Sequence, residues 1–92
     1  MLEDIKKVLR VSSAAFDKEI TSLIEAARQD LLLSGVAPFK ANDDTDPLVR
    51  KAIMTYCKAE FVFDNKEAYR FRRSYEDLRN HLTLAGEYNA IP

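Results

Sequence analysis

The sequence is poor in the residues from which most enzyme sites are built. It has one cysteine (Cys57), one histidine (His81) and no tryptophan. A lone cysteine cannot form an internal disulfide, and a lone histidine excludes metal sites built on several imidazoles. The two glycines, Gly35 and Gly86, lie too far apart to build a glycine-rich phosphate loop. We therefore expect no enzyme activity, no cofactor and no metal.

Strong charge of one sign and long apolar runs are also missing. The formal net charge is −1, whereas nonspecific affinity for nucleic acid comes from a surplus of lysine and arginine. Glu3 and Asp4 stand where a secretion signal would carry bases, and charges interrupt every apolar stretch. A bilayer requires roughly 20 apolar residues. The sequence thus predicts no membrane segment and a reducing, cytoplasmic environment.

The composition that remains is that of a folded protein. Apolar residues make up 47% of the chain and charged residues 32%, which is too apolar for a disordered protein. A chain of this length has room for one domain, here residues 1–92, and hides only about 60 to 65% of its unfolded surface. Its stability is therefore expected to be modest unless a partner adds burial.

Apolar residues recur every three or four positions in four segments, which is the spacing of helices with one buried side. The segments span residues 2–10, 15–33, 47 to a break at 64–65, and 68–82. Gly35 is expected to end the second helix, and Asp46 followed by Pro47 to begin the third. Residues 36–45 are predicted to form a loop. The fold class is therefore all-α: a compact bundle of four to five helices with a long loop and a short mobile tail, residues 83–92.

Two features with possible chemistry are better explained by structure. Cys57 falls within the apolar pattern of its helix, where a buried thiol behaves as a small hydrophobe. Asp43, Asp44 and Asp46 lie close together but lack the spacing and distal glutamate of a helix-loop-helix calcium site. We expect core packing for the cysteine and loop or capping chemistry for the aspartates.

The distribution of aromatic residues gives the strongest indication of a binding surface. Seven of the nine fall in the second half of the chain. Four of these, Phe61, Phe63, Tyr69 and Phe71, cannot all face inward from two adjoining helices in so small a domain. Exposed aromatics beside arginines are typical of protein interfaces. The aromatic and arginine residues Phe61, Phe63, Tyr69, Arg70, Arg72 and Arg73 give one candidate interface, and the polar tail residues Glu87, Tyr88 and Asn89 give a second contact that could order on docking to a partner.

The same arginine-rich run allows a second interpretation. Arg70, Arg72 and Arg73 surround an aromatic residue, which is a pattern also found in nucleic-acid patches. However, bases outnumber acids by only two between Lys66 and Leu82, so the local field is weak. A small helical DNA-binding or regulatory module therefore stands as the alternative to a protein interface.

Three stretches together resemble the small head-tail connector, or adaptor, proteins of long-tailed bacteriophages. They are the opening 2–9 with the helix at 20–28, the segment 46–53 leading to Tyr56 and 65–68, and the segment 70–82 running into 86–89. Each is a pattern of helix-forming residues without invariant chemistry, but together they cover almost the whole chain.

This resemblance implies a structural role in a phage or prophage particle. It implies a ring of about a dozen copies on the portal protein, located at the head-tail junction of the virion after assembly in the host cytoplasm. Head-completion and tail proteins would be further partners. Phage DNA would pass through the central channel without sequence-specific binding. The family's link to DNA packaging refers to this place in the particle and not to an ATPase.

Overall fold

The structure is a computed structural model that describes residues 1–61 and 66–90. Its helices are α1 (Leu2–Leu9), α2 (Asp17–Ser34), the single turn α3 (Pro38–Ala41), α4 (Pro47–Glu60) and α5 (Ala68–Leu84), with a 3-10 turn at Ala14–Phe16 before α2. No strand occurs in the described part of the chain, where the sole β-type pairing is one isolated bridge between Val36 and Asn89. The predicted all-α bundle is confirmed.

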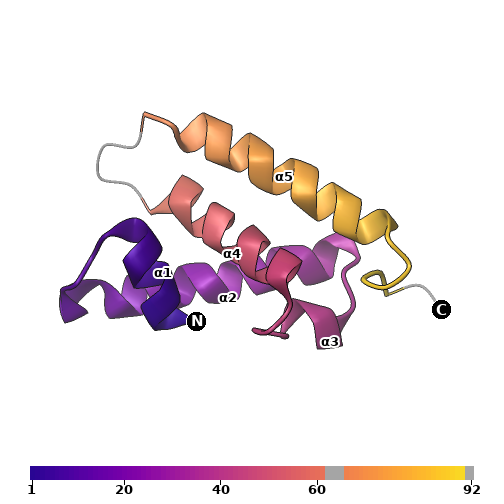
Figure 1. Ribbon diagram of the computed structural model, residues 1–92, viewed down its shortest axis with the longest axis horizontal. Helices are drawn as coiled ribbons and strands as arrows, with labels where there is room; N and C mark the ends of the chain where they lie inside the picture. The colour runs from indigo at the N-terminus through magenta and orange to yellow at the C-terminus, as the bar shows by residue number, and fades with distance from the viewer. Residues whose placement is uncertain (62–65, 91–92) are drawn as a thin grey trace.

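The long helices form a layered bundle with α4 at its centre. α4 and α5 lie side by side and run in opposite directions, and α2 packs against the other side of α4 (Figure 1). α1 packs against both α2 and α4, and α3 lies near the C-terminal end of α2. The molecule is elongated as a result, with extents of 42 × 23 × 19 Å.

Local chemistry sets the helix ends as the sequence predicted. Gly35 adopts the left-handed conformation (φ 113°), and its N–H bonds the carbonyl groups of Leu31 and Leu32. The Asp46 carboxylate accepts the N–H groups of Leu48 and Val49 at 2.9 and 3.1 Å, which caps α4. Ser13 also acts as a cap, but of the 3-10 turn that precedes α2.

The predicted loop over residues 36–45 is not entirely irregular. Pro38 begins the one-turn helix α3, because its fixed φ suits the first helical position and its missing N–H would have no partner there. The predicted end of the last helix also needs correction, since α5 continues past Leu82 through Leu84.

The core is aliphatic at its centre and aromatic toward one side. Tyr75 packs edge-on against Tyr56, with ring centroids 5.1 Å apart. Cys57 is fully buried, as predicted, and burial raises the pKa of its thiol to about 12, so the sulfur is a poor nucleophile at neutral pH. The largest fully buried side chains come from α1, α2, α4, α5 and the α2–α3 turn: Ile5, Ile20, Leu31, Ile53, Leu82, Val36, Val49 and Cys57.

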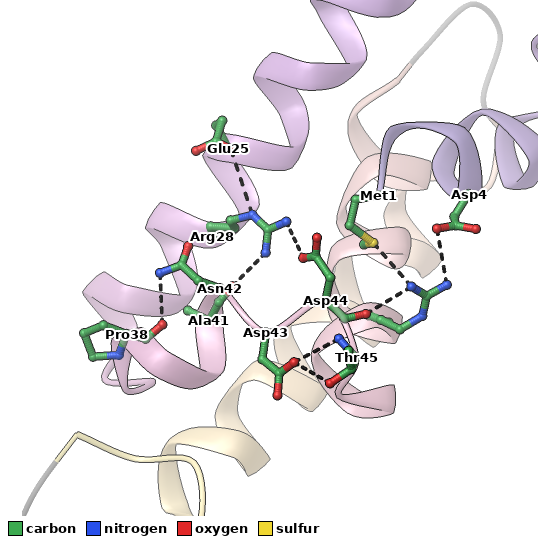
Figure 2. A network of polar contacts seen from close by, with 11 residues as sticks. Met1, Asp4, Glu25, Arg28, Pro38, Ala41, Asn42, Asp43, Asp44 and Thr45 are labelled. Carbon is green, nitrogen blue, oxygen red and sulfur yellow. Dashed lines mark hydrogen bonds and ion pairs between the residues drawn. The ribbon is translucent and has the colours of Figure 1, made fainter.

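A buried arginine connects α2 to the segment between α3 and α4 (Figure 2). Arg28 is 9% exposed. One of its Nη atoms donates to the carbonyl oxygen of Ala41 at 3.0 Å, and the other donates to the Asp44 carboxylate at 2.6 Å. Because a buried guanidinium requires both charge balance and hydrogen-bond acceptors, this side chain holds the α3 region in place.

We predict that Arg28→Met lowers the free energy of unfolding by about 1 to 2 kcal/mol, because it leaves the carbonyl of buried Ala41 without its donor and removes the ion pair with Asp44. Urea denaturation measures the change. Gln29→Met is the control, since Gln29 is the exposed neighbour on the same helix. Equal losses in the two variants would contradict the role assigned to Arg28.

Candidate assembly surfaces

The candidate interface residues occupy two opposite ends of the molecule. Tyr69, Arg70, Arg72 and Arg73 belong to the first turns of α5, here called the arginine end. The tail residues Glu87, Tyr88 and Asn89 follow the other end of the same helix (Figure 1). Phe63 lies outside the described residues. The sequence assigned the aromatic and arginine residues to one surface and the tail to another, and in the fold these two groups lie at opposite ends of α5.

The arginine end combines an exposed aromatic residue with paired cations. Tyr69 is 76% exposed. Arg70 pairs with Glu67 at 2.5 Å, Arg73 approaches Asp77 at 3.9 Å, and Arg72 pairs with Glu60 of α4. The last contact replaces the Arg72–Glu76 pair that helical spacing predicts. Because these arginines face carboxylates, the surface has little surplus positive charge.

Phe61 does not contribute to this exposed surface. It is 8% exposed and packs edge-on against Phe16, with ring centroids 5.6 Å apart. The partner comes from the turn before α2, so the contact depends on the tertiary fold and not on helical spacing. An interface role for the remaining candidates stays a prediction.

The arrangement of α4 and α5 bears on the DNA-binding alternative. A helix-turn-helix places its two helices at about 90 to 120°. Here α4 and α5 lie alongside each other in opposite directions (Figure 1), and the arginines at their junction are paired. The observed geometry does not favour that alternative.

The tail is held against the bundle by main-chain bonds. The N–H of Ala37 donates to the Tyr88 carbonyl oxygen at 2.7 Å, and the N–H of Ala90 donates to the Gly35 carbonyl oxygen at 2.9 Å. These bonds join residues 88–90 to the turn between α2 and α3. The sequence predicted a mobile segment from Thr83, but residues 85–90 have a defined docking position.

The Tyr88 side chain extends this docking to the start of α4. Its hydroxyl donates to the Asp46 carboxylate at 2.9 Å, and Lys40 donates to the same carboxylate at 3.1 Å. The Lys40 Nζ atom also lies 4.7 Å from the centroid of the Tyr88 ring, a cation–π distance. Asp46 thus serves α4, α3 and the tail at once.

These contacts set the ionisation of the Asp46 carboxyl. Its burial acts to raise the pKa, but the N–H of Val49, the Tyr88 hydroxyl and the Lys40 ammonium outweigh that effect. The pKa of Asp46 is therefore held below its ordinary value. The hydrogen bond to Asp46 in turn raises the pKa of Lys40.

Exposed apolar side chains that sequence reasoning missed lie near the tail. Leu33, near the end of α2, is 87% exposed, and Leu84, the last residue of α5, is 83% exposed. We call this pair the leucine end, and Phe39 on α3 is a further exposed side chain at 71%. The run Leu31-Leu32-Leu33 could have indicated an exposed leucine, because three consecutive positions of a helix cannot all face one core.

Within residues 1–61 and 66–90, no group of three or more His, Cys, Asp or Glu side chains is arranged to hold a metal ion. In the same ranges, no helix is long and apolar enough to cross a bilayer. The described surface is thus characterised by its exposed apolar and charged side chains.

We predict that Asp46→Ala lowers the free energy of unfolding by about 1 to 2 kcal/mol at pH 7, through loss of the α4 cap. Asp46→Asn keeps a capping oxygen, so its free energy of unfolding is expected to fall less.

The stabilising effect of the Asp46 carboxylate depends on pH. Because folding lowers the pKa of Asp46, the ionised carboxylate stabilises the folded protein at pH values above the ordinary pKa of aspartate. This stabilisation is lost as the pH falls through the pKa of Asp46 in the folded protein. The wild-type advantage over Asp46→Asn should therefore narrow below about pH 4 in urea titrations. A constant or widening gap would contradict this coupling.

We predict that Tyr88→Phe loosens the tail, because it removes the hydroxyl that donates to Asp46. Amide hydrogen exchange at Ala37 and Ala90 should accelerate about fivefold, the effect of one lost hydrogen bond. Tyr69→Phe is the matched control, since it removes an exposed tyrosine hydroxyl at the other end. If Tyr88→Phe leaves both exchange rates unchanged, Tyr88 does not hold the tail.

A family model described as phage connector protein matches residues 1–89, which include every helix and nearly the whole docked tail. No curated protein and no solved structure matches the chain.

Proposed function

The chain belongs to the phage connector protein family, and from this premise we propose that it assembles as a ring on the portal protein, at the junction between the head and the tail. The family match supports this proposal most strongly. It covers residues 1–89, and connector proteins are structural components of phage particles. In this role the chain forms part of the channel through which DNA passes.

The shape of the subunit supports a ring. A closed ring requires two unlike surfaces that meet head to tail on neighbouring copies. The arginine end and the leucine end lie far apart on an elongated molecule (Figure 1), and they differ in chemistry. Contact of exposed Tyr69 with exposed leucines would bury apolar surface on both copies. The family resemblance implies about a dozen copies in this ring.

The charge distribution supports a channel that does not grip DNA. The net charge is −1, and Arg70, Arg72 and Arg73 are each paired with a carboxylate. Because the chain has no surplus of cations over carboxylates, sequence-independent retention of DNA by phosphate contacts would be weak. The other partners would be head-completion and tail proteins in the virion, after assembly in the host cytoplasm.

The direct test is to mix the purified chain with the cognate portal ring and image the product by cryo-electron microscopy. Additional ring-shaped density on the portal, with one helical subunit per repeat, is expected. A portal that stays bare at saturating concentrations of the chain would reject the proposal.

We predict that the double variant Leu33→Asp and Leu84→Asp abolishes ring assembly while the monomer stays folded, because it places charge where the apolar contact forms. Sedimentation with the portal measures assembly, and circular dichroism measures folding. Thr21→Asp with Ala26→Asp is the control, since it adds the same charge at two exposed positions of α2 that belong to neither end. Equal loss of assembly in both variants would show that net charge, and not the leucine end, is responsible.

A further inference from the structure

An apolar hollow lies beside the arginine end, between the turn that follows α1 and the start of α5. Its volume is about 900 Å³. The turn after α1 and the first turns of α5 lie at the same end of the molecule (Figure 1). The apolar residues that line this hollow, here called the α1 hollow, are Val8, Leu9, Val11, Phe16, Phe61 and Phe71.

The way α1 ends builds one wall of the α1 hollow. Arg10 adopts the left-handed conformation (φ 60°), which is uncommon for a residue with a side chain. The N–H of Val11 donates to the Lys6 carbonyl oxygen at 3.0 Å, and the N–H of Arg10 donates to that of Lys7 at 3.2 Å. This Schellman closure stops the helix sharply, so Val11 packs beside Leu9 against the core instead of continuing α1.

Aromatic contacts hold the other wall in place. The Lys58 Nζ and the Arg70 guanidinium carbon lie 5.4 and 5.5 Å from the centroid of the Phe71 ring, which are cation–π distances. The Phe16 ring packs edge-on against Phe61. Because these rings already have defined positions, little side-chain freedom is lost when a partner binds between them.

The lining side chains leave apolar surface uncovered. Val8, Leu9, Val11, Phe16 and Phe71 are each half-buried, so their remaining surface faces the concavity that they line. An apolar side chain that enters such a hollow removes apolar surface from water on both partners. The α1 hollow is therefore suited to an uncharged, aliphatic occupant.

The opposite end of the chain carries protruding side chains of this kind. Leu33 and Leu84 come from adjoining helix ends, because a Cβ atom on Gly35 would lie 3.9 Å from Thr83. In the described part of the chain, the large apolar side chains that are more than 70% exposed are Leu33, Phe39, Tyr69 and Leu84. Only Tyr69 of these four is at the end that holds the hollow.

The shape of the molecule identifies whose leucines can enter the hollow. Its longest extent is 42 Å, and the α1 hollow and the leucine end lie at opposite ends (Figure 1). One copy therefore cannot fill its own hollow. A protruding apolar group at one end and an apolar hollow at the other join identical copies head to tail. This pairing buries both surfaces, which every copy supplies in equal number.

We propose that the α1 hollow receives Leu33 and Leu84 from the leucine end of a second copy of this chain. The place of this contact in a ring rests on the proposed function, but the contact itself does not require the portal. Tyr69, two residues before Phe71 on α5, adds exposed apolar surface at the receiving end.

The test uses two forms of the full chain, mixed at millimolar concentration. One carries a spin label at His81→Cys, an exposed position one turn before Leu84; fully buried Cys57 does not compete for the label. The other is isotope-labelled and otherwise unchanged. The amide NMR signals of Val8, Leu9 and Val11 in the isotope-labelled copy should lose intensity. A label at Ser22→Cys, on the exposed side of α2, is the control and should spare them.

Two variants identify the contacting side chains. Adding Leu84→Asp to the spin-labelled copy should restore the signals of the hollow. Val8→Lys should weaken self-association about tenfold in sedimentation equilibrium, and Thr21→Lys, which adds the same charge at an exposed position of α2, by less than about twofold. Circular dichroism checks that each variant is folded, and the spin-label experiment itself needs no substitution in the hollow.

Several results would overturn the proposal. They are undiminished signals of the hollow, equal losses with the label at Ser22→Cys, or losses that persist after Leu84→Asp. Portal rings that shift the hollow signals, when a second copy does not, would assign the hollow to the portal instead. Contact between copies with a portal that stays bare would reject the ring on the portal alone. A decorated portal without contact at the hollow would reject the hollow alone.

Discussion

The structure depends on one carboxylate that serves three segments. Asp46 accepts two N–H groups at the start of α4, the ammonium of Lys40 from α3 and the hydroxyl of Tyr88 from the tail. It is 7% exposed, so these donors replace the water that an ionised carboxylate would otherwise require. Without this group, α4 loses its cap and the tail loses its side-chain anchor in the same step.

This arrangement fixes which surfaces the bundle presents. Docking of residues 85–90 against the α2–α3 turn leaves Leu33 and Leu84 exposed near the end of the bundle. At the other end, pairing of Arg72 with Glu60 connects α5 to α4 and leaves Tyr69 exposed. A small bundle that exposes apolar side chains at separated positions has unsatisfied apolar surface, which assembly with neighbours can bury. This physical property agrees with membership of a connector family.

The parts of the fold that sequence predicts are those determined by neighbours along the chain. Gly35 and the Asp46-Pro47 pair set helix ends through contacts within a few residues, and the buried position of Cys57 follows from helical periodicity. The positions of Phe61 and Arg72 escaped prediction, because each is set by a partner from another segment: Phe16 for the first and Glu60 for the second.

The same distinction between local and distant contacts applies to the candidate interface residues. The exposed positions of Tyr69, Arg70 and Arg73 follow from their place on α5, and the sequence identifies them correctly as surface residues. The docked position of Tyr88 does not follow from sequence, because its carboxylate partner is 42 residues away. The leucine end was not predicted, because Leu33 lies outside the apolar pattern of its helix and Leu84 falls in a segment that the sequence assigned to the tail.

Cross-linking between differently labelled copies tests most directly whether the two ends of this subunit meet in an assembled particle. Particles would be formed from a mixture of light and isotope-heavy chains and treated with a lysine-reactive reagent. Lys66, beside the arginine end, should be linked to Lys40, near the leucine end, in mixed light–heavy pairs. Links between two copies of Lys66, without any mixed Lys66 to Lys40 link, would contradict a head-to-tail ring.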